Sequence, residues 1–125
     1  MDSAIVLFAH GARDPEWSAP LVRLRTAIER AAPGLAVHLA YLEMQGPGLP
    51  EVLETLARAG ARRISVVPVF WSRGGHVTKD LPPLLAQWQT RHPAVQVQVL
   101  PALSDLPGMD GFLAQAILGF AQPAQ

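Results

Sequence analysis

Three residues that can bind a metal ion or carry a proton lie where apolar, strand-like segments end. His10 and Glu43 each stand directly at the end of such a segment, and His76 follows a third segment after a pair of glycines. Parallel strands all end on the same side of a sheet, so we expect the three side chains to converge on one face. Two imidazoles and one carboxylate suit a borderline divalent ion such as cobalt, iron, nickel or zinc, and open coordination positions would let the ion leave.

Each of these residues, taken alone, also has an ordinary structural interpretation. A histidine after a strand often bonds to nearby backbone, and a glutamate is usually a solvated surface residue. The coincidence of all three at strand ends favours the metal site. The other two histidines are left out of it, because His38 stands inside a strand-like segment and His92 stands at a helix end, where a cation meets the helix dipole.

Three cationic side chains lie close in sequence to His10 and His76. They are Arg13, Arg73 and Lys79. Solvated surface charge explains them as well as a role in binding does. In the binding role they would meet carboxylates or phosphates of a substrate, with arginine able to bind in bidentate fashion.

Large apolar side chains supply the remaining candidates. Met44 and Trp71 come late enough in their segments to line the wall of a pocket, where they would suit a large flat ligand. Trp17, Phe70 and Trp88 are expected in the core, and Trp17 starts the apolar face of the first helix.

Periodicity and turn residues predict the elements that position these groups. We expect strands at 4–9, 35–42, 62–71 and 95–100 and helices at 15–32, 49–59, 77–91 and 108–120. Asp14 is expected to cap the first helix, and Pro82 and Pro83 to lie near the first turn of the third, because prolines deeper inside would break it. Four alternating strands and helices predict an α/β fold, a flavodoxin-like three-layer α/β/α sandwich around a four-stranded parallel sheet, with the last strand at an edge.

Composition limits the possible classes of function. The 125 residues predict a single domain, with 121–125 as a frayed tail. The chain has no cysteine, so thiolate metal sites are excluded and a reducing cytoplasm is the expected location. Ten Lys and Arg balance ten Asp and Glu, which argues against a nucleic-acid surface. No segment approaches the roughly 20 apolar residues of a membrane span, so no membrane association is expected.

Three motifs in order carry a family resemblance. Residues 10–15 (HGARDP) resemble the His-Gly-Ser-Arg-Asp-Pro opening of the small class II chelatases of the CbiX and sirohydrochlorin chelatase type. Residues 41–43 with Pro50 resemble their second motif, and residues 67–82 their third. The resemblance runs from Ile5 to about Leu103. Ala12 departs from the usual serine, and the stretch 71–73 replaces a more apolar one.

The resemblance implies insertion of Co²⁺ or Fe²⁺, or Ni²⁺ in some members, into sirohydrochlorin or a related tetrapyrrole, in cobalamin or siroheme biosynthesis. It implies a lyase that needs no organic cofactor, because the metal is a substrate. Long members hold two such domains facing each other, so a short chain is expected to pair as a homodimer. His10 and His76 would hold the ion and accept the pyrrole protons, with Glu43 as third ligand or second base. The cations would meet the carboxylates of the ring.

Two other functions stay open. A strand followed by His-Gly is also typical of histidine phosphatases, which would make this a phosphoryl-transfer enzyme. Those enzymes place an arginine immediately before the histidine, and this chain has Ala9 there. The second alternative is a non-catalytic module that carries a metal ion or a tetrapyrrole without inserting one into the other.

Overall fold

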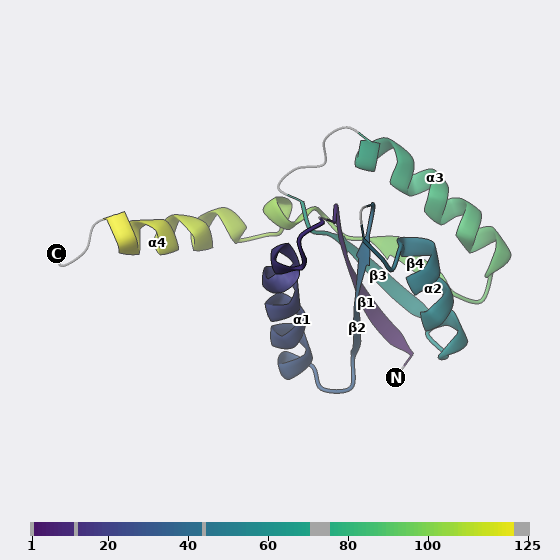
Figure 1. Ribbon diagram of the computed structural model, residues 1–125. Coiled ribbons are helices and arrows are strands. Elements are labelled where there is room, and N and C mark those ends of the chain that lie inside the picture. Colours follow the sequence, from purple (N-terminus) through teal and green to yellow (C-terminus); the bar gives the residue numbers. More distant parts are fainter. Residues whose placement is uncertain (1, 12, 44, 71–75, 122–125) are drawn as a thin grey trace.

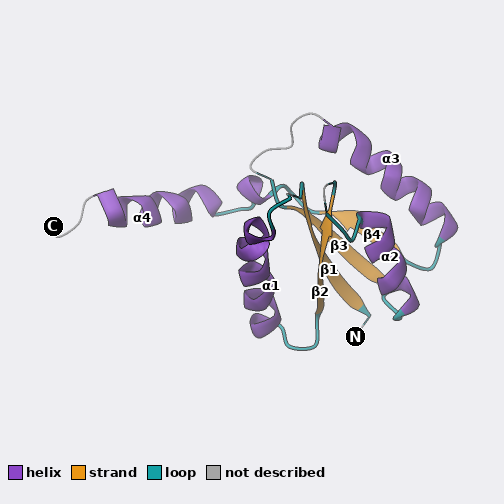
Figure 2. Cartoon of the chain, in the orientation of Figure 1, coloured by secondary structure: helices purple, strands orange, loops and turns teal. Residues whose placement is uncertain are grey.

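A computed structural model describes residues 2–11, 13–43, 45–70 and 76–121, with the side chains at 15 and 76–79 outside that description. The elements, in chain order, are β1 (Ser3–Ala9), η1 (Pro15–Ser18), α1 (Ala19–Ala31), β2 (Ala36–Tyr41), α2 (Leu49–Arg58), β3 (Arg63–Pro68), α3 (His76–Arg91), β4 (Gln96–Val99), η2 (Leu103–Asp105) and α4 (Met109–Ala121) (Figures 1 and 2). None of the helices within these described ranges is long and apolar enough to span a bilayer.

The four strands form one parallel sheet in the order β2-β1-β3-β4. Strand β1 is central and pairs with β2 on one side and β3 on the other, whereas β4 is an edge strand, as its alternating glutamines predicted. The chain passes from β1 to β2 on one side and then crosses to β3 and β4 on the other side. The direction in which strands are added to the sheet therefore reverses beside β1. Open α/β sheets bind ligands at the carboxyl edge near such a reversal.

Helices cover both faces of the sheet, which confirms the predicted three-layer architecture. α2 and α3 lie on one face and α1 on the other (Figure 1). Among the described residues, sixteen buried side chains form the core between the sheet and α2–α3, and only three are buried in the cluster beneath α1. Trp88 of α3 is the largest side chain in the main core, where it is 2% exposed. The α1 face is therefore the less completely covered one.

The predicted elements are confirmed, with differences at their ends. β3 ends at Pro68, three residues before the predicted end at Trp71. The first helix opens with a 3-10 turn, in which the side chain of Asp14 accepts a hydrogen bond from Glu16 N at 3.0 Å, so the predicted cap is confirmed. α3 begins at His76, so Pro82 and Pro83 lie inside the helix rather than at its start. The prediction that they lie near the first turn was wrong, because the residues from His76 to Leu81 are already helical before the first proline.

One predicted core residue and the last helix lie in unexpected places. Trp17 was expected in the core but is 73% exposed, because it stands in the 3-10 turn that precedes α1 and projects from the end of the α1 face. The last helix forms as predicted, but α4 extends away from the sheet beyond α1 and covers neither face (Figure 1). Ala121 is its last residue, so most of the predicted frayed tail lies outside the described residues.

Candidate active site

The segments that follow β1 and β2 stay paired after the strands end. Leu42 N donates to Ala9 O at 2.8 Å, and Glu43 N donates to His10 O at 3.0 Å. These two hydrogen bonds extend the parallel pairing of β1 with β2 to the carboxyl edge of the sheet. The structure therefore places the backbones of His10 and Glu43 side by side, with both residues exposed to solvent.

Gly11 allows this close approach. Its φ is +94°, and a Cβ built on it would lie 2.0 Å from Glu43 O, far closer than real Cβ contacts. Only glycine takes this backbone conformation without strain and leaves room for the Glu43 carbonyl. The glycine after the histidine thus sets the separation between the two segments that carry His10 and Glu43.

Phe70, in the segment that follows β3, supports the ring of His10. The two rings meet edge-on, with centroids 4.7 Å apart and an interplanar angle of 72°. Phe70 is itself held by an edge-on contact with Phe8, at 5.9 Å, and is 9% exposed. Val69 N donates to Phe8 O at 2.8 Å, which continues the pairing of β1 with β3 into this segment. The imidazole therefore rests on a side chain anchored in the core.

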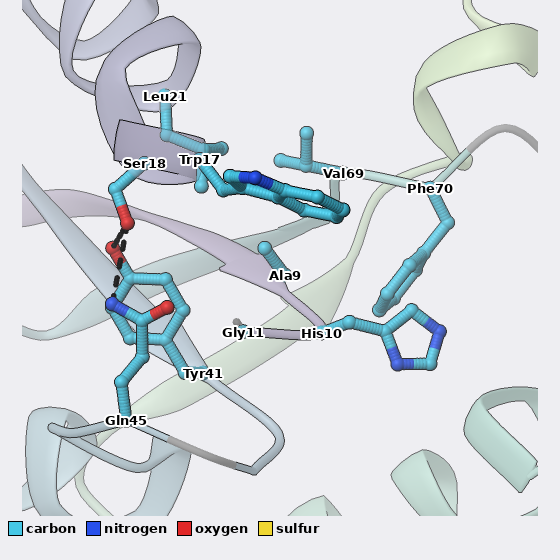
Figure 3. Close-up of a pocket in the computed structure, with 10 residues that line it drawn as sticks. All are labelled: Ala9, His10, Gly11, Trp17, Ser18, Leu21, Tyr41, Gln45, Val69 and Phe70. Atoms are coloured by element: carbon cyan, nitrogen blue, oxygen red, sulfur yellow. Dashed lines mark hydrogen bonds between the residues drawn. The ribbon is translucent and has the colours of Figure 1, made fainter. Parts of the chain in front are cut away.

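A cavity of about 280 Å³ opens beside His10 at the carboxyl edge of the sheet (Figure 3). It is lined by Ala9, His10, Gly11, Trp17, Ser18, Leu21, Tyr41, Gln45, Val69 and Phe70. The rings of His10 and Phe70 lie at one end of the group of lining residues, and a polar cluster lies at the other (Figure 3). The lining comes from the ends of three strands and from the start of the first helix, so the cavity depends on the fold as a whole.

The polar cluster was not predicted from the sequence. Tyr41 Oη and Gln45 Nε2 both donate to Ser18 Oγ, each at 3.2 Å. Tyr41 is buried and ends β2, whereas Ser18 and Gln45 come from η1 and from the loop before α2. The one signal in the sequence was that Tyr41 belongs to the second motif, at residues 41–43. Its hydroxyl partner lies 23 residues earlier, which no local pattern reveals.

The other predicted site residues fall partly outside the described structure. Arg13 is described and exposed, two residues before η1. The backbones of His76 and Lys79 lie in the first turn of α3, but their side chains lie outside the description. Met44, Trp71 and Arg73 lie outside it altogether. Among the side chains that are described, no group of three or more His, Asp and Glu could hold a metal ion.

The two histidines that were left out of the site occupy structural positions. His92 stacks on Trp88, with centroids 3.9 Å apart and rings 7° from parallel. Its Nδ1 lies 3.0 Å from Trp88 O and its Nε2 lies 2.6 Å from Glu54. His38 stands in β2 and pairs in register with Val6. His92 therefore has structural partners at the end of α3, and it lies in a different layer from the cavity.

A family model described as CbiX matches residues 4–118. The chain is 35% identical to the sirohydrochlorin cobaltochelatase of Methanocaldococcus jannaschii over 89 residues, which cover 71% of this chain and 62% of that protein. It is 30% identical to the sirohydrochlorin cobaltochelatase of Methanosarcina barkeri over 82 residues, which cover 66% of this chain and 63% of that protein. The chain therefore spans less than two thirds of the length of these relatives.

Solved structures share the fold. The putative cobalamin biosynthesis CbiX protein of Marinobacter aquaeolei VT8 superimposes with a TM-score of 0.82 at 21% identity, covering 98% of this chain and 99% of that one. SirB from Bacillus subtilis with Fe³⁺ superimposes with a TM-score of 0.78 at 20% identity, covering 98% of this chain and 49% of that one. The match to SirB thus takes up about half of a longer chain.

Proposed function

The chain belongs to the CbiX family, and we propose that it inserts a divalent metal ion into sirohydrochlorin or a related tetrapyrrole. The metal would be Co²⁺ or Fe²⁺, with Ni²⁺ as a third candidate, and the product would enter cobalamin or siroheme biosynthesis. The relatives named above are sirohydrochlorin cobaltochelatases, and the solved SirB structures hold cobalt or iron. The observation that carries the proposal is the backbone hydrogen bond from Glu43 N to His10 O, which places these two residues side by side at the edge of the sheet where the cavity opens.

In the proposed reaction, His10, His76 and Glu43 hold the ion while the macrocycle approaches. Imidazole and carboxylate ligands bind borderline divalent ions, and an incomplete ligand set leaves coordination positions open for the pyrrole nitrogens. As bonds form between the ion and the ring nitrogens, two pyrrole N–H bonds break and their protons pass to nearby bases. A neutral imidazole is a good acceptor near pH 7, so the two histidines serve both tasks. The edge-on contact with Phe70 limits the rotation of the His10 ring.

The cavity beside His10 would hold one part of the macrocycle. Its volume of about 280 Å³ lies just below the range of about 300 to 1,000 Å³ typical of small-molecule pockets. In the expected homodimer, a second copy of the chain would face this cavity and enclose the rest of the ring. Arg13, Arg73 and Lys79 would meet the carboxylates of the ring, and Met44 and Trp71 would line the wall. We expect that no organic cofactor takes part. We also expect the reaction to take place in the cytoplasm.

The test is the rate at which the protein accelerates Co²⁺ insertion into sirohydrochlorin, followed by absorbance. His10→Ala and His76→Ala should each lower that rate at least tenfold, because each removes a metal ligand and a proton acceptor. His38→Ala and His92→Ala are matched controls from the same four histidines and should keep at least half of the wild-type rate. Circular dichroism should show that all four variants fold.

The outcomes separate the proposal from its alternatives. A wild-type rate in either His10→Ala or His76→Ala would refute the assigned site. A wild-type protein that binds Co²⁺ or sirohydrochlorin without accelerating insertion would be a carrier rather than a chelatase. Hydrolysis of a chromogenic phosphate ester that depends on His10 would point to phosphoryl transfer. A titration of the rate with Co²⁺, Fe²⁺ and Ni²⁺ would then rank the metals, because ligand type alone does not select among them.

A further inference from the structure

Trp17 is a large apolar side chain that lies open to solvent inside the candidate active site. It is 73% exposed, although it lines the cavity beside His10. It belongs to η1, the 3-10 turn before α1. In Figure 3 its indole ring extends from the Ser18 side of the lining residues toward Val69. An exposed aromatic ring on the wall of a cavity offers a flat apolar ligand a surface on which to stack.

Ser18, the next residue, has a hydroxyl group whose two acceptor sites are both occupied. Tyr41 Oη and Gln45 Nε2 each donate to Ser18 Oγ at 3.2 Å. A serine hydroxyl accepts two hydrogen bonds and donates one. Within the described part of the chain, no atom accepts the hydrogen bond that Ser18 can donate. The hydroxyl proton of Ser18 is therefore available to a ligand in the cavity that this residue lines.

Helix capping does not explain the position of the Ser18 hydroxyl. Serine is common as the N-cap of a helix, where its side chain accepts a hydrogen bond from a backbone N–H of the first turn. Ser18 is the N-cap of α1, but its side chain makes no capping hydrogen bond. The turn η1 before α1 is capped by Asp14 instead, through Glu16 N. The side chain of Ser18 is thus turned toward the cavity rather than toward its own helix.

The partners of Ser18 hold its hydroxyl in a fixed place. Tyr41 is 6% exposed and pairs in register with Ala9 of the central strand β1. Its backbone N–H donates to Pro47 O at 2.9 Å, which ties the end of β2 to the loop before α2. A donor that is already positioned by its neighbours loses little conformational freedom when a ligand binds. The Ser18 hydroxyl therefore has the properties of a preformed binding group.

We propose that Trp17 and Ser18 bind the rim of the tetrapyrrole substrate. The indole ring of Trp17 stacks on the face of one pyrrole unit, and the hydroxyl of Ser18 donates a hydrogen bond to a carboxylate on the same edge of the macrocycle. This inference rests on the proposed function and adds two substrate-binding residues to it. The Ser18 cluster and His10 lie at opposite ends of the lining residues (Figure 3). A ring held in this way has its rim at the polar end and its nitrogen atoms toward His10.

The character of the cavity favours a small molecule over a protein side chain as the partner of Trp17. Small-molecule sites are concave and mostly apolar, with a few fixed polar groups that orient the ligand. The cavity has this composition, with apolar walls from Ala9, Leu21 and Val69 and a fixed donor at one end. A protein segment that rested on the exposed face of Trp17 would leave the Ser18 proton unused.

Binding of metal-free sirohydrochlorin to the full chain, measured by equilibrium dialysis, tests the stacking. Trp17→Ala should weaken binding about tenfold or more, because it removes the stacked ring. Trp17→Phe keeps an aromatic ring and should bind within about threefold of wild type. Thr26→Ala is a control on α1 outside the cavity, where Thr26 Oγ1 donates to Val22 O, and should bind like wild type. Wild-type affinity in Trp17→Ala, or equal losses in Trp17→Ala and Trp17→Phe, would overturn the stacking.

A magnetic resonance signature distinguishes stacking from a general loss of structure. The chain has three tryptophans, and each gives one indole N–H resonance, which a single Trp→Phe substitution assigns. A macrocycle stacked on an indole ring shifts the indole protons upfield through its ring current. Metal-free sirohydrochlorin should therefore move the Trp17 resonance upfield and leave that of Trp88, which is 2% exposed in the core, in place. A Trp17 resonance that stays in place while sirohydrochlorin binds would overturn the proposal.

A pair of substitutions of equal size tests the carboxylate at Ser18. Ser18→Asn keeps a hydrogen-bond donor, whereas Ser18→Asp puts a carboxylate in its place. Asn and Asp are equally good N-cap residues, so circular dichroism should show the same fold for both variants. Ser18→Asp should bind metal-free sirohydrochlorin at least about tenfold more weakly than Ser18→Asn, because like charges repel. Equal affinities would overturn the assignment of a carboxylate to Ser18.

These experiments separate the inference from the proposed function. If the wild-type chain does not bind sirohydrochlorin, the chelatase proposal and this inference both fail. If the wild-type chain binds sirohydrochlorin and accelerates Co²⁺ insertion, while the Trp17 and Ser18 variants bind as tightly as wild type, only this inference fails.

Discussion

Replacing Gly11 by alanine tests how the site is built, because a second glycine provides a matched control. Gly11 and Gly60 have nearly the same φ, +94° and +100°. A Cβ on Gly11 would lie 2.0 Å from Glu43 O, whereas a Cβ on Gly60 would meet nothing within 4 Å. Both substitutions carry the cost of a left-handed alanine, about 1 to 2 kcal/mol. Only Gly11→Ala also forces two backbone segments apart.

The size of the extra effect follows from that contact. The distance from the new Cβ to Glu43 O must rise from 2.0 Å to at least 3.0 Å. A displacement of this size lengthens the 3.0 Å hydrogen bond between Glu43 N and His10 O beyond useful range. Losing that bond and relieving the clash should add about 1 to 3 kcal/mol of destabilisation. If His10 and Glu43 bind the ion as proposed, a shift of about 1 Å between their segments should also slow metal insertion about 100-fold.

Urea unfolding and the Co²⁺ insertion assay measure the two effects. Gly11→Ala should lower the free energy of unfolding by about 2 to 5 kcal/mol and the insertion rate about 100-fold. Gly60→Ala should lower the free energy of unfolding by about 1 to 2 kcal/mol and leave the rate unchanged. If the two variants were equally stable and equally active, the close approach of the Gly11 and Glu43 segments would play no part in the site.

Two further substitutions test the surroundings of His10. Phe70→Leu removes the edge-on contact with the His10 ring and should lower the free energy of unfolding in urea by about 1 to 2 kcal/mol. The rate of metal insertion should fall several-fold. An unchanged rate would show that the His10 ring needs no support from Phe70. Tyr41→Phe removes the donor to Ser18 Oγ at 3.2 Å and should cost about 1 kcal/mol. It should raise KM for sirohydrochlorin more than it lowers kcat, and a fall in kcat alone would contradict a role in binding the ring.

The sheet and the strand-end positions were predictable because they depend on local patterns and on one topological rule. Apolar runs marked the strands, and parallel strands must end on the same side, which is enough to place His10 and Glu43 at one edge of the sheet. The distance between their segments was not predictable. It depends on Gly11 and the Glu43 carbonyl, which are 32 residues apart in the chain.

Tertiary packing explains what the sequence did not reveal. Apolar spacing put Trp17 on the face of the first helix, but the 3-10 turn at residues 15–18 changes the direction of its side chain. Periodicity also predicted α4 but not its position, because a helix that is apolar on all sides has no preferred face to direct its packing. The Ser18, Tyr41 and Gln45 cluster joins three separate segments, so only the folded chain shows it.

The most direct test of the central claim is a crystal structure of the protein soaked with Co²⁺. One ion is expected at the carboxyl edge of β1, with a His10 nitrogen, a His76 nitrogen and a Glu43 oxygen each about 2.0 to 2.2 Å from it. At least one coordination position should be left to water. The account is contradicted if these three side chains point to different places with no ion between them, or if cobalt binds away from the cavity.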